Sequence, residues 1–302
     1  MNSVGIDISK GRSTIAVMRP FGEIVISPFE VRHTDSELSE LARRLKSLNG
    51  ETRVVMEATG NYHAPVAKLL HDAGLYVSVV NAKLVHGYGN NDLRRVKTDR
   101  KDAVKLANYG LDRWLTLPRY VPEENTRLLL KNCYRQYRQY SKVQTVLKNN
   151  LISLLDMTFP NANRLFVSPA RADGSEKWVD FVAEFWHCEC VSERSLKSFV
   201  NKYWRWCRKH GYNFSEEKAH AIYDEASGHI GVMPKSETTK LLVEQAVSQL
   251  SATSAALAAL KQEMQSLSSQ LPEYPVVMGM FGVGPILGPQ LIAEIGDVRR
   301  FY

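Results

Sequence analysis

Four acidic residues have the types and spacing that could hold a divalent cation. Asp7 lies inside an alternating apolar pattern, Glu57 follows a short apolar run, and Asp99 and Asp102 stand three residues apart, on one face of a helix. Clustered carboxylate oxygens are the ligands that Mg²⁺ prefers, and such carboxylates repel one another unless a cation neutralises them. Taken singly, each acid is typical of a turn, a helix start or a surface ion pair. Taken together, they predict a Mg²⁺ site for phosphoryl transfer.

The surrounding pattern predicts an α/β sheet that could bring these acids together. Alternation of apolar and polar residues indicates a hairpin of residues 2–8 and 12–18, and residues 23–29 could add a third strand. Three strands followed by alternating helices and strands favour a sheet with helices on its faces. The later elements are expected as a helix over 34–48, a strand over 53–56, a helix over 61–74 and a strand over 75–80. Glu57 would then end a strand, at the edge where open α/β sheets bind ligands.

Positive charge is concentrated in one stretch of the chain. The net charge is +7, but residues 94–148 hold fourteen Lys and Arg against five acids, which is +9 for this stretch and −2 for the rest. Such a field attracts a polyanion, and the interleaved tyrosines 134, 137 and 140 could stack on unpaired bases. A solvated helix face is the alternative. The predicted nucleic-acid contacts are Arg94, Arg95, Lys97, Arg100, Lys101, Lys105, Arg127, Lys131, Arg135, Arg138, Lys142 and Lys148.

The rest of the chain reads as helical segments around an insert whose fold the pattern does not reveal. A long helix is expected over about 123–157, and the insert follows. Apolar residues then recur at heptad spacing up to residue 271, which predicts a coiled coil or a long helix hairpin. Because the seam is narrow, it favours one partner helix and self-association as a dimer or tetramer. The expected parts are 1–158, 159–235, 236–271 and 272–302.

Composition excludes several protein classes. Among 302 residues, 44 % are apolar, yet no apolar run is long enough to cross a bilayer, and the N-terminus opens on a strand pattern without a signal peptide. Four cysteines make a poor disulfide framework and favour a reducing compartment, the cytoplasm. Buried packing is the expected role of most of them. One alternative is a zinc site formed by a cysteine–histidine set: Cys188, Cys190, Cys207 and His210.

Three motifs carry a family resemblance. Gly5-Ile6-Asp7-Ile8-Ser9-Lys10, Val55-Met56-Glu57-Ala58-Thr59-Gly60 and Lys97-Thr98-Asp99-Arg100-Lys101-Asp102-Ala103 resemble, in this order, the DEDD-type transposases of bacterial insertion sequences, relatives of the Piv invertase and now known as bridge-RNA-guided recombinases. The resemblance covers about residues 2–158 and resumes over 277–302. It implies an α/β, RuvC-like (ribonuclease-H-like) N-terminal domain in which Asp7, Glu57, Asp99 and Asp102 bind Mg²⁺ and serve catalysis.

The same resemblance implies the partners. Family members pair a structured guide RNA with donor and target DNA, and a serine in a C-terminal domain attacks the DNA; that serine is expected beyond residue 302, so this chain alone could be inactive. Gly282 and Gly284 lie in a segment that looks like a helix-hairpin-helix start, where backbone N–H groups could approach a DNA phosphate. A packed helix turn is the alternative there. The rival functions are a metal-dependent nuclease or junction resolvase, and a non-catalytic nucleic-acid-binding scaffold.

Overall fold

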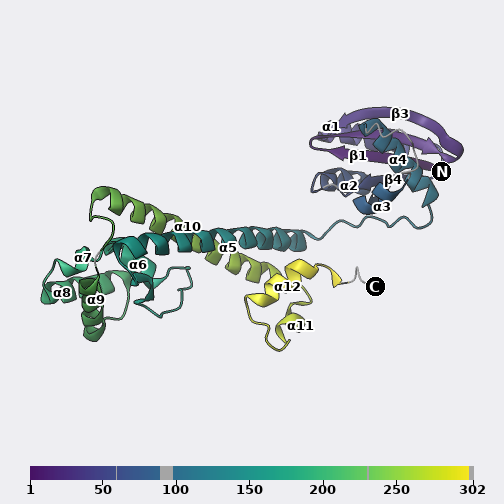
Figure 1. The fold of residues 1–302 in the computed structure, drawn as a ribbon. Helices are drawn as coiled ribbons and strands as arrows, with labels where there is room; N and C mark the ends of the chain where they lie inside the picture. The colour runs from purple at the N-terminus through teal and green to yellow at the C-terminus, as the bar shows by residue number, and fades with distance from the viewer. Residues whose placement is uncertain (59, 89–97, 230, 299–302) are drawn as a thin grey trace. The chain divides into compact units, whose positions relative to one another are not determined.

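The protein is described by a computed structural model that covers residues 1–58, 60–88, 98–229 and 231–298 (Figure 1). Its contacts divide the chain into two compact units, Met1–Pro122 and Glu123–Tyr302. The boundary differs from the expected one at residue 158, because the long basic helix packs within the second unit rather than ending the first. Each unit is therefore described by itself.

The first unit is built on a mixed five-stranded sheet. Its strands are β1 (Asn2–Ser9), β2 (Arg12–Arg19), β3 (Glu23–Arg32), β4 (Thr52–Glu57) and β5 (Tyr76–Val80), in the order β3-β2-β1-β4-β5. A short 3₁₀ turn, η1 (Pro20–Gly22), joins β2 to β3. The first three strands are antiparallel, whereas β1, β4 and β5 run parallel. The predicted α/β class and all five predicted strands are confirmed.

The two faces of this sheet are covered by different helices. Val4 and Ile6 of β1 point to the face that packs against α1 (Asp35–Lys46) and α2 (His63–Asp72). Because side chains alternate along a strand, the neighbouring residues Gly5 and Asp7 belong to the opposite face. That face packs against α4 (Asp99–Asp112), with α3 (Ala82–Gly87) in the same apolar cluster. The alternation that placed Asp7 opposite its apolar neighbours is thus realised.

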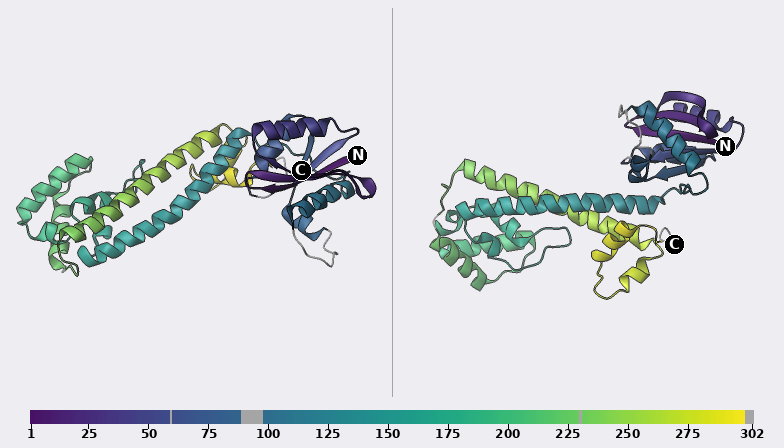
Figure 2. Two further views of the ribbon diagram at one scale, coloured as in Figure 1. Left: turned by 90° about the horizontal axis from the view of Figure 1, so that it is seen from above. Right: turned by 45° about the vertical axis from the view of Figure 1, so that its right-hand side comes forward.

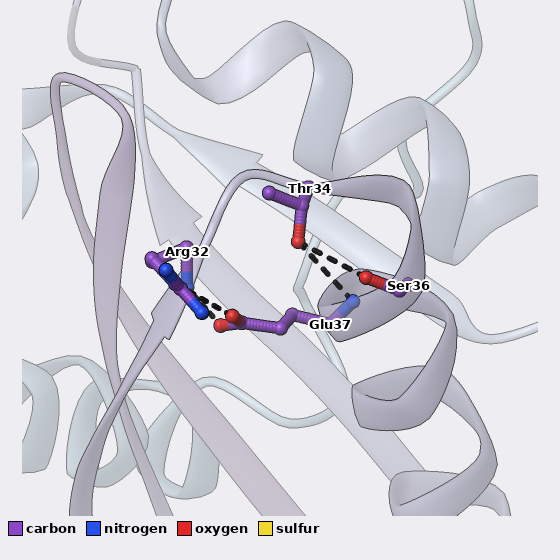
Figure 3. A network of polar contacts seen from close by, with 4 residues as sticks. All are labelled: Arg32, Thr34, Ser36 and Glu37. Atoms are coloured by element: carbon purple, nitrogen blue, oxygen red, sulfur yellow. Dashed lines mark hydrogen bonds and ion pairs between the residues drawn. The ribbon is translucent and has the colours of Figure 1, made fainter.

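The start of α1 shows why this helix begins where the sequence predicts (Figure 3). Thr34 is the N-cap, and its hydroxyl accepts a hydrogen bond from the Glu37 amide N–H at 3.4 Å. The Glu37 carboxylate reaches back and accepts hydrogen bonds from the backbone N–H of Arg32 at 2.7 Å and from its Nε at 2.6 Å. Two otherwise unpaired backbone donors are satisfied in this way, which fixes the turn between β3 and α1.

The second unit is organised by two long helices that lie side by side and run antiparallel, α5 (Asn125–Thr158) and α10 (Glu237–Ser269) (Figures 1 and 2). Leu130 shares an apolar cluster with Leu267 near one end, and Leu155 shares another with Leu250 near the other. Gln144 donates a hydrogen bond to the Ser254 hydroxyl between them. The heptad seam is therefore buried against α5 of the same chain, as in the long helix hairpin that was the alternative to a coiled coil, and self-association as a dimer or tetramer stays a prediction.

Short helices fill the insert between α5 and α10. They are η2 (Ala162–Arg164), α6 (Lys177–Glu184), α7 (Glu189–Ser192), α8 (Leu196–His210) and α9 (Glu216–Gly228). Their core is aromatic: Phe181 stacks on Phe185 at 4.6 Å between ring centroids, and Tyr203 stacks on Trp206 at 5.6 Å. This core is continuous with the end of α5 and the start of α10, so the insert is part of the second unit's main core.

Two short helices follow the long pair, α11 (Tyr274–Met278) and α12 (Leu287–Ile295). They pack on the start of α5 and the end of α10 through Val277 and Ile292. Arg127 on α5 forms a buried bidentate ion pair with Glu273, with Nη2 to Oε2 at 3.0 Å, and also donates to the Gly296 carbonyl. Across the described residues, no helix has the length and apolarity needed to traverse a lipid bilayer.

Candidate active site and nucleic-acid interface

Asp7 and Glu57 lie next to each other at the carboxyl ends of two parallel strands. Ile6 of β1 is in register with Met56 of β4, so the residues that follow them, Asp7 and Glu57, occupy neighbouring positions on the same face of the sheet. Both side chains are half-buried. On the other side of β1, Asp7 is in register with the buried Thr14 of β2. The carboxyl ends of parallel strands are where such sheets place their ligands.

Helix α4 sits directly on β1 because Gly5 leaves room for it. A Cβ at Gly5 would come inside 3.0 Å of the Ala103 carbonyl and the Ala107 amide nitrogen. One turn further on, Gly110 lies against the side chain of Ser3. Since α4 moves from Gly5 toward Ser3 as its numbering rises, its first turn lies toward the end of β1 that carries Asp7. The helix therefore directs its start to the two strand carboxylates.

That first turn carries the remaining two acids. Thr98 is the N-cap of α4, and its hydroxyl accepts a hydrogen bond from the Lys101 N–H at 3.3 Å. Asp99 is exposed and Asp102 is half-buried. They lie one helical turn before Ala103 and Leu106, respectively, which are buried. Carboxylates are favoured at this position because the helix dipole is positive there.

The donor set fits a hard divalent cation in its chemistry. The four carboxylates belong to two strand ends and one helix turn that meet at one edge of the sheet face that α4 covers. Across the described ranges, no three or more His, Cys, Asp or Glu side chains lie close enough together to hold a metal ion. To bind a cation, the four carboxylates would therefore have to move closer together. Without the cation, their mutual repulsion opposes that movement.

The predicted basic contacts of the first unit have mixed outcomes. Arg100 and Lys101 are exposed on the first turn of α4, beside the acids. Lys105 is half-buried, and its Nζ lies 3.5 Å from the His86 carbonyl that it donates to. Arg94, Arg95 and Lys97 lie outside the described residues.

Three basic residues of α5 have carboxylate partners. Arg127 is 6 % exposed and paired with Glu273, so its prediction as a nucleic-acid contact is wrong. Lys131 lies 3.5 Å from Glu123, and Lys148 forms an ion pair with Glu176 at 2.8 Å. Glu273 and Glu176 come from outside the stretch that the local charge count covered, whereas Glu123 lies within it. For Lys131 and Lys148, whose side chains stay partly exposed, the nucleic-acid contact remains a prediction.

Arg135, Arg138 and Lys142 remain as an exposed basic stripe on α5, which we call the α5 stripe. No ion pair with a carboxylate is found for them among the described residues, and α5 contains no acid before Asp156. Two of the three tyrosines expected to stack on bases contribute to packing, and base stacking by Tyr140 stays a prediction. Tyr134 and Tyr137 pack against the cluster around Leu130, although Arg138 also lies 5.8 Å from the Tyr134 ring centroid.

The glycine turn near the C-terminal end is open. Gly282 adopts a left-handed φ of 80°, and a Cβ at Gly282 or Gly284 would meet nothing within 4 Å. The turn joins the short helices α11 and α12, which fits both a helix-hairpin-helix start and a packed helix turn, so the helix-hairpin-helix stays a prediction. Its backbone is accessible, with the exposed Phe281 at the tip of the turn.

The cysteine–histidine set is not assembled. Cys188 and Cys207 are buried, and no cluster of three or more potential ligands contains them or any other described residue. The Cys188 thiol lies 3.8 Å from His187 Nδ1, and burial raises the pKa of both thiols. His210 packs instead on the Trp206 ring at 5.1 Å. Cys188 and Cys207 therefore pack in the aromatic core, and the zinc set stays an untested alternative.

Sequence reasoning missed the residues that bring α4 to the sheet. Gly5 and Gly110 carry no functional group, but both lie where a helix and a strand approach too closely for a Cβ. A glycine inside a strand pattern often marks such a close backbone approach, and Gly5 lies inside the Asp7 motif. That signal was available in the sequence.

Comparison with known proteins adds a family and several relatives. A family described as a transposase, the DEDD transposases of the IS110 type, matches residues 4–160. The pilin gene-inverting protein of Moraxella bovis is 27 % identical over 134 residues, 44 % of this chain and 38 % of that protein. The pilin gene-inverting protein of Moraxella lacunata matches to the same extent. The aligned part of this chain thus spans well under half of these relatives.

Solved structures of RuvC are also similar. RuvC of Thermus thermophilus in complex with a Holliday junction substrate gives a TM-score of 0.30 at 13 % identity, covering 40 % of this chain and 99 % of that one. A second Thermus thermophilus RuvC structure gives 0.28 at 16 % identity, covering 40 % of this chain and 100 % of that one.

Proposed function

This chain belongs to the DEDD transposase family of the IS110 type, and on that premise we propose that it recombines DNA with a divalent-metal site formed by Asp7, Glu57, Asp99 and Asp102. The supporting observation is the shared register of Asp7 and Glu57 at the ends of β1 and β4, on the face where α4 begins. The proposal includes the whole activity: in a bacterial cell, a guide RNA pairs with the donor and target DNA that the protein recombines. No serine of this chain is assigned as the nucleophile.

The four carboxylates of the proposed site come from two kinds of element. Asp7 and Glu57 are fixed by the sheet, so they provide the rigid half, and Asp99 and Asp102 provide the half that follows α4. A bound Mg²⁺ would stabilise the charge that develops on a phosphate during strand cleavage. Arg100 and Lys101, exposed on the same helix turn, are placed to hold the flanking phosphates of the DNA backbone.

The α5 stripe is the proposed contact for nucleic acid in the second unit. Three cations without carboxylate partners on one helix attract a phosphate backbone, and each contact releases condensed counterions. Replacing Arg135, Arg138 and Lys142 by Gln should lower the slope of log K against log salt by about 2 for a single-stranded ligand. An unchanged slope would remove the stripe from the proposed interface.

Metal titration tests the carboxylate site directly. Isothermal titration of the chain with Mn²⁺ should show binding that Asp7→Asn and Asp102→Asn each weaken at least tenfold. The control is Asp156→Asn, an exposed acid at the far end of α5, which should bind Mn²⁺ like the wild type. Equal affinities in wild type and Asp7→Asn would refute the site.

The guide RNA has its own experiment. Expression of the chain together with the DNA that flanks its gene, followed by purification and sequencing of the bound nucleic acid, should yield one discrete RNA from that DNA. Heterogeneous cellular RNA alone would leave charge as the only basis for binding and would refute guidance by a dedicated RNA.

A further inference from the structure

A group of cations lies over aromatic rings in the insert of the second unit. Arg171, Lys177 and Lys218, which we call the insert cluster, surround the rings of Phe166 and Tyr212. Arg171 Cζ is 3.9 Å from the Tyr212 ring centroid. Lys177 Nζ is 4.9 Å from the Phe166 centroid and 5.0 Å from that of Tyr212, and Lys218 Nζ is 5.7 Å from the Phe166 centroid. Three positive charges thus share two neighbouring rings.

The backbone holds the three residues in place from different elements. Lys177 is the first residue of α6, and Lys218 lies in the first turn of α9, where its N–H donates to the N-cap Ser215 hydroxyl at 3.1 Å. Arg171 Nη2 donates to the His210 carbonyl at 2.8 Å and the Gly211 carbonyl at 3.1 Å, at the end of α8. The cluster is therefore built by long-range packing rather than by a local run of charge.

The rings beneath the cluster are themselves fixed. Tyr212 stacks on Trp206 at 5.2 Å between centroids, and Phe166 stacks on the same ring at 6.4 Å. Trp206 is 2 % exposed and belongs to the main core. Rings fixed in this way hold the three cations that lie over their faces at defined positions.

Carboxylates do not neutralise the insert cluster. Within the described ranges, no ion pair joins any of its three members to an acid, and the nearby acids have other partners. Asp180 accepts from the Tyr212 hydroxyl at 2.5 Å, and Asp173 accepts from the Ser175 N–H at 2.9 Å. The Asp173 pKa is lowered mainly by this bond to Ser175 and, to a smaller extent, by the charge of Arg171.

The helix termini add positive potential at the insert cluster, and the pKa of Lys177 responds to the neighbouring charges. Lys177 and Lys218 both lie at helix N-termini, where the helix dipole adds positive potential and where a lysine is intrinsically disfavoured. The pKa of Lys177 is lowered, first by burial and then by the charges of Lys218 and Arg171. No hydrogen bond to either ammonium group is found among the described residues. An anion that binds here would relieve repulsion that the fold leaves in place.

We propose that Arg171, Lys177 and Lys218 form a binding site for the phosphodiester backbone of a nucleic acid on the helical insert. The choice of a nucleic acid as the source of the phosphate rests on the proposed function, whereas the affinity for phosphate rests on the cluster alone. Ammonium and guanidinium groups bind phosphate oxygens without reading bases, so the site positions the strand rather than selecting its sequence. RNA and DNA present the same phosphate, and the experiment separates them.

The first experiment measures the salt dependence of binding by the full chain. Fluorescein-labelled single-stranded RNA and DNA of one sequence are titrated with wild type and with the double variant Lys177→Gln/Lys218→Gln. Two lost phosphate contacts should lower the slope of log K against log salt by about 1.4 for the strand that occupies the site. The matched control Lys197→Gln/Lys46→Gln removes two exposed lysines and the same charge, and its slope should not change.

The second experiment does not depend on nucleic acid. Wild-type chain is acetylated with and without inorganic tripolyphosphate, and the modification of each lysine is followed by mass spectrometry. Lys177 and Lys218 should be protected at least threefold more than Lys197. Melting curves by circular dichroism establish that the double variant folds like the wild type.

The outcomes separate the two proposals. If RNA or DNA binds but neither the slope nor the acetylation responds, the insert site is overturned and the proposed function stands. If neither RNA nor DNA binds, the proposed function fails, and the phosphate site is decided by tripolyphosphate protection alone. A slope change for RNA but not DNA, or the reverse, assigns the strand.

Discussion

Replacing Gly5 by Ala should separate α4 from the sheet and disturb the candidate metal site without touching any carboxylate. The new Cβ would come inside 3.0 Å of two backbone atoms of α4, one on Ala103 and one on Ala107. Ordinary contact needs about 3.4 Å, so the helix must move by more than about 1 Å. Backbone atoms cannot rotate away as a side chain can. We therefore expect destabilisation at the upper end of the overpacking range, about 3 kcal/mol.

Hydrogen exchange measured by mass spectrometry reports this change where it occurs. Amides of α4 should lose about 3 kcal/mol of protection in Gly5→Ala, because local opening of the helix becomes easier. Mn²⁺ affinity should fall roughly 10–100-fold, as it does when residues that support metal ligands are lost. Gly87→Ala is the matched control in the same unit, since its Cβ would meet nothing within 4 Å and its φ is ordinary.

A second glycine provides a graded comparison. A Cβ at Gly110 would meet the side chains of Ser3 and Val55, which can shift, and alanine is the better helix former by about 1 kcal/mol. Gly110→Ala should therefore cost less than Gly5→Ala. If Gly5→Ala keeps wild-type exchange in α4 and wild-type Mn²⁺ affinity, the close approach at Gly5 does not place the helix, and the reasoning is refuted.

Three further outcomes are expected. Glu273→Gln should destabilise the second unit by about 3 kcal/mol at pH 7, because Arg127 loses its buried partner. Since the bond to Arg127 lowers the pKa of Glu273 below its ordinary 4.5, this difference should stay constant above about pH 4.5 and shrink as the pH falls through the lowered pKa in urea titrations; a pH-independent difference would contradict it. A chelator should leave the melting temperature of the second unit unchanged, whereas a drop would support the zinc alternative. Gly174→Ala should lower the free energy of unfolding by about 1 kcal/mol or more, because the φ of Gly174 is +85° and a Cβ there would press on the Ser254 carbonyl. Unchanged urea unfolding would argue against that contact.

The first unit was predictable because its signals are local. The alternation around Asp7 and the short apolar runs determine strands within a few residues of those observed, and Thr34 marks the start of α1. The same alternation placed Asp7 on the face opposite the apolar core. The strand order was not predicted, because the connection through α1 carries β4 past β2 and β3 to lie beside β1.

The second unit was less predictable because its contacts join distant residues. The heptad pattern indicated one partner helix, but not that α5 of the same chain provides it. Arg127 read as a surface cation, since its partner Glu273 lies far along the chain. The insert cluster left no local signal either: its members are separated by up to 47 positions and meet only through the aromatic core.

The antiparallel pairing of α5 with α10 has a consequence for synthesis on the ribosome. Leu130 leaves the ribosome 137 residues before its cluster partner Leu267. At translation rates of about 5–20 residues per second, the apolar side of α5 is without its partner for roughly 7–27 s. The first unit, whose contacts are complete by residue 122, can fold during that interval. At this stage the nascent chain carries a folded first unit and an incomplete helical hairpin. The exposed apolar side of α5 is the kind of surface that chaperones recognise.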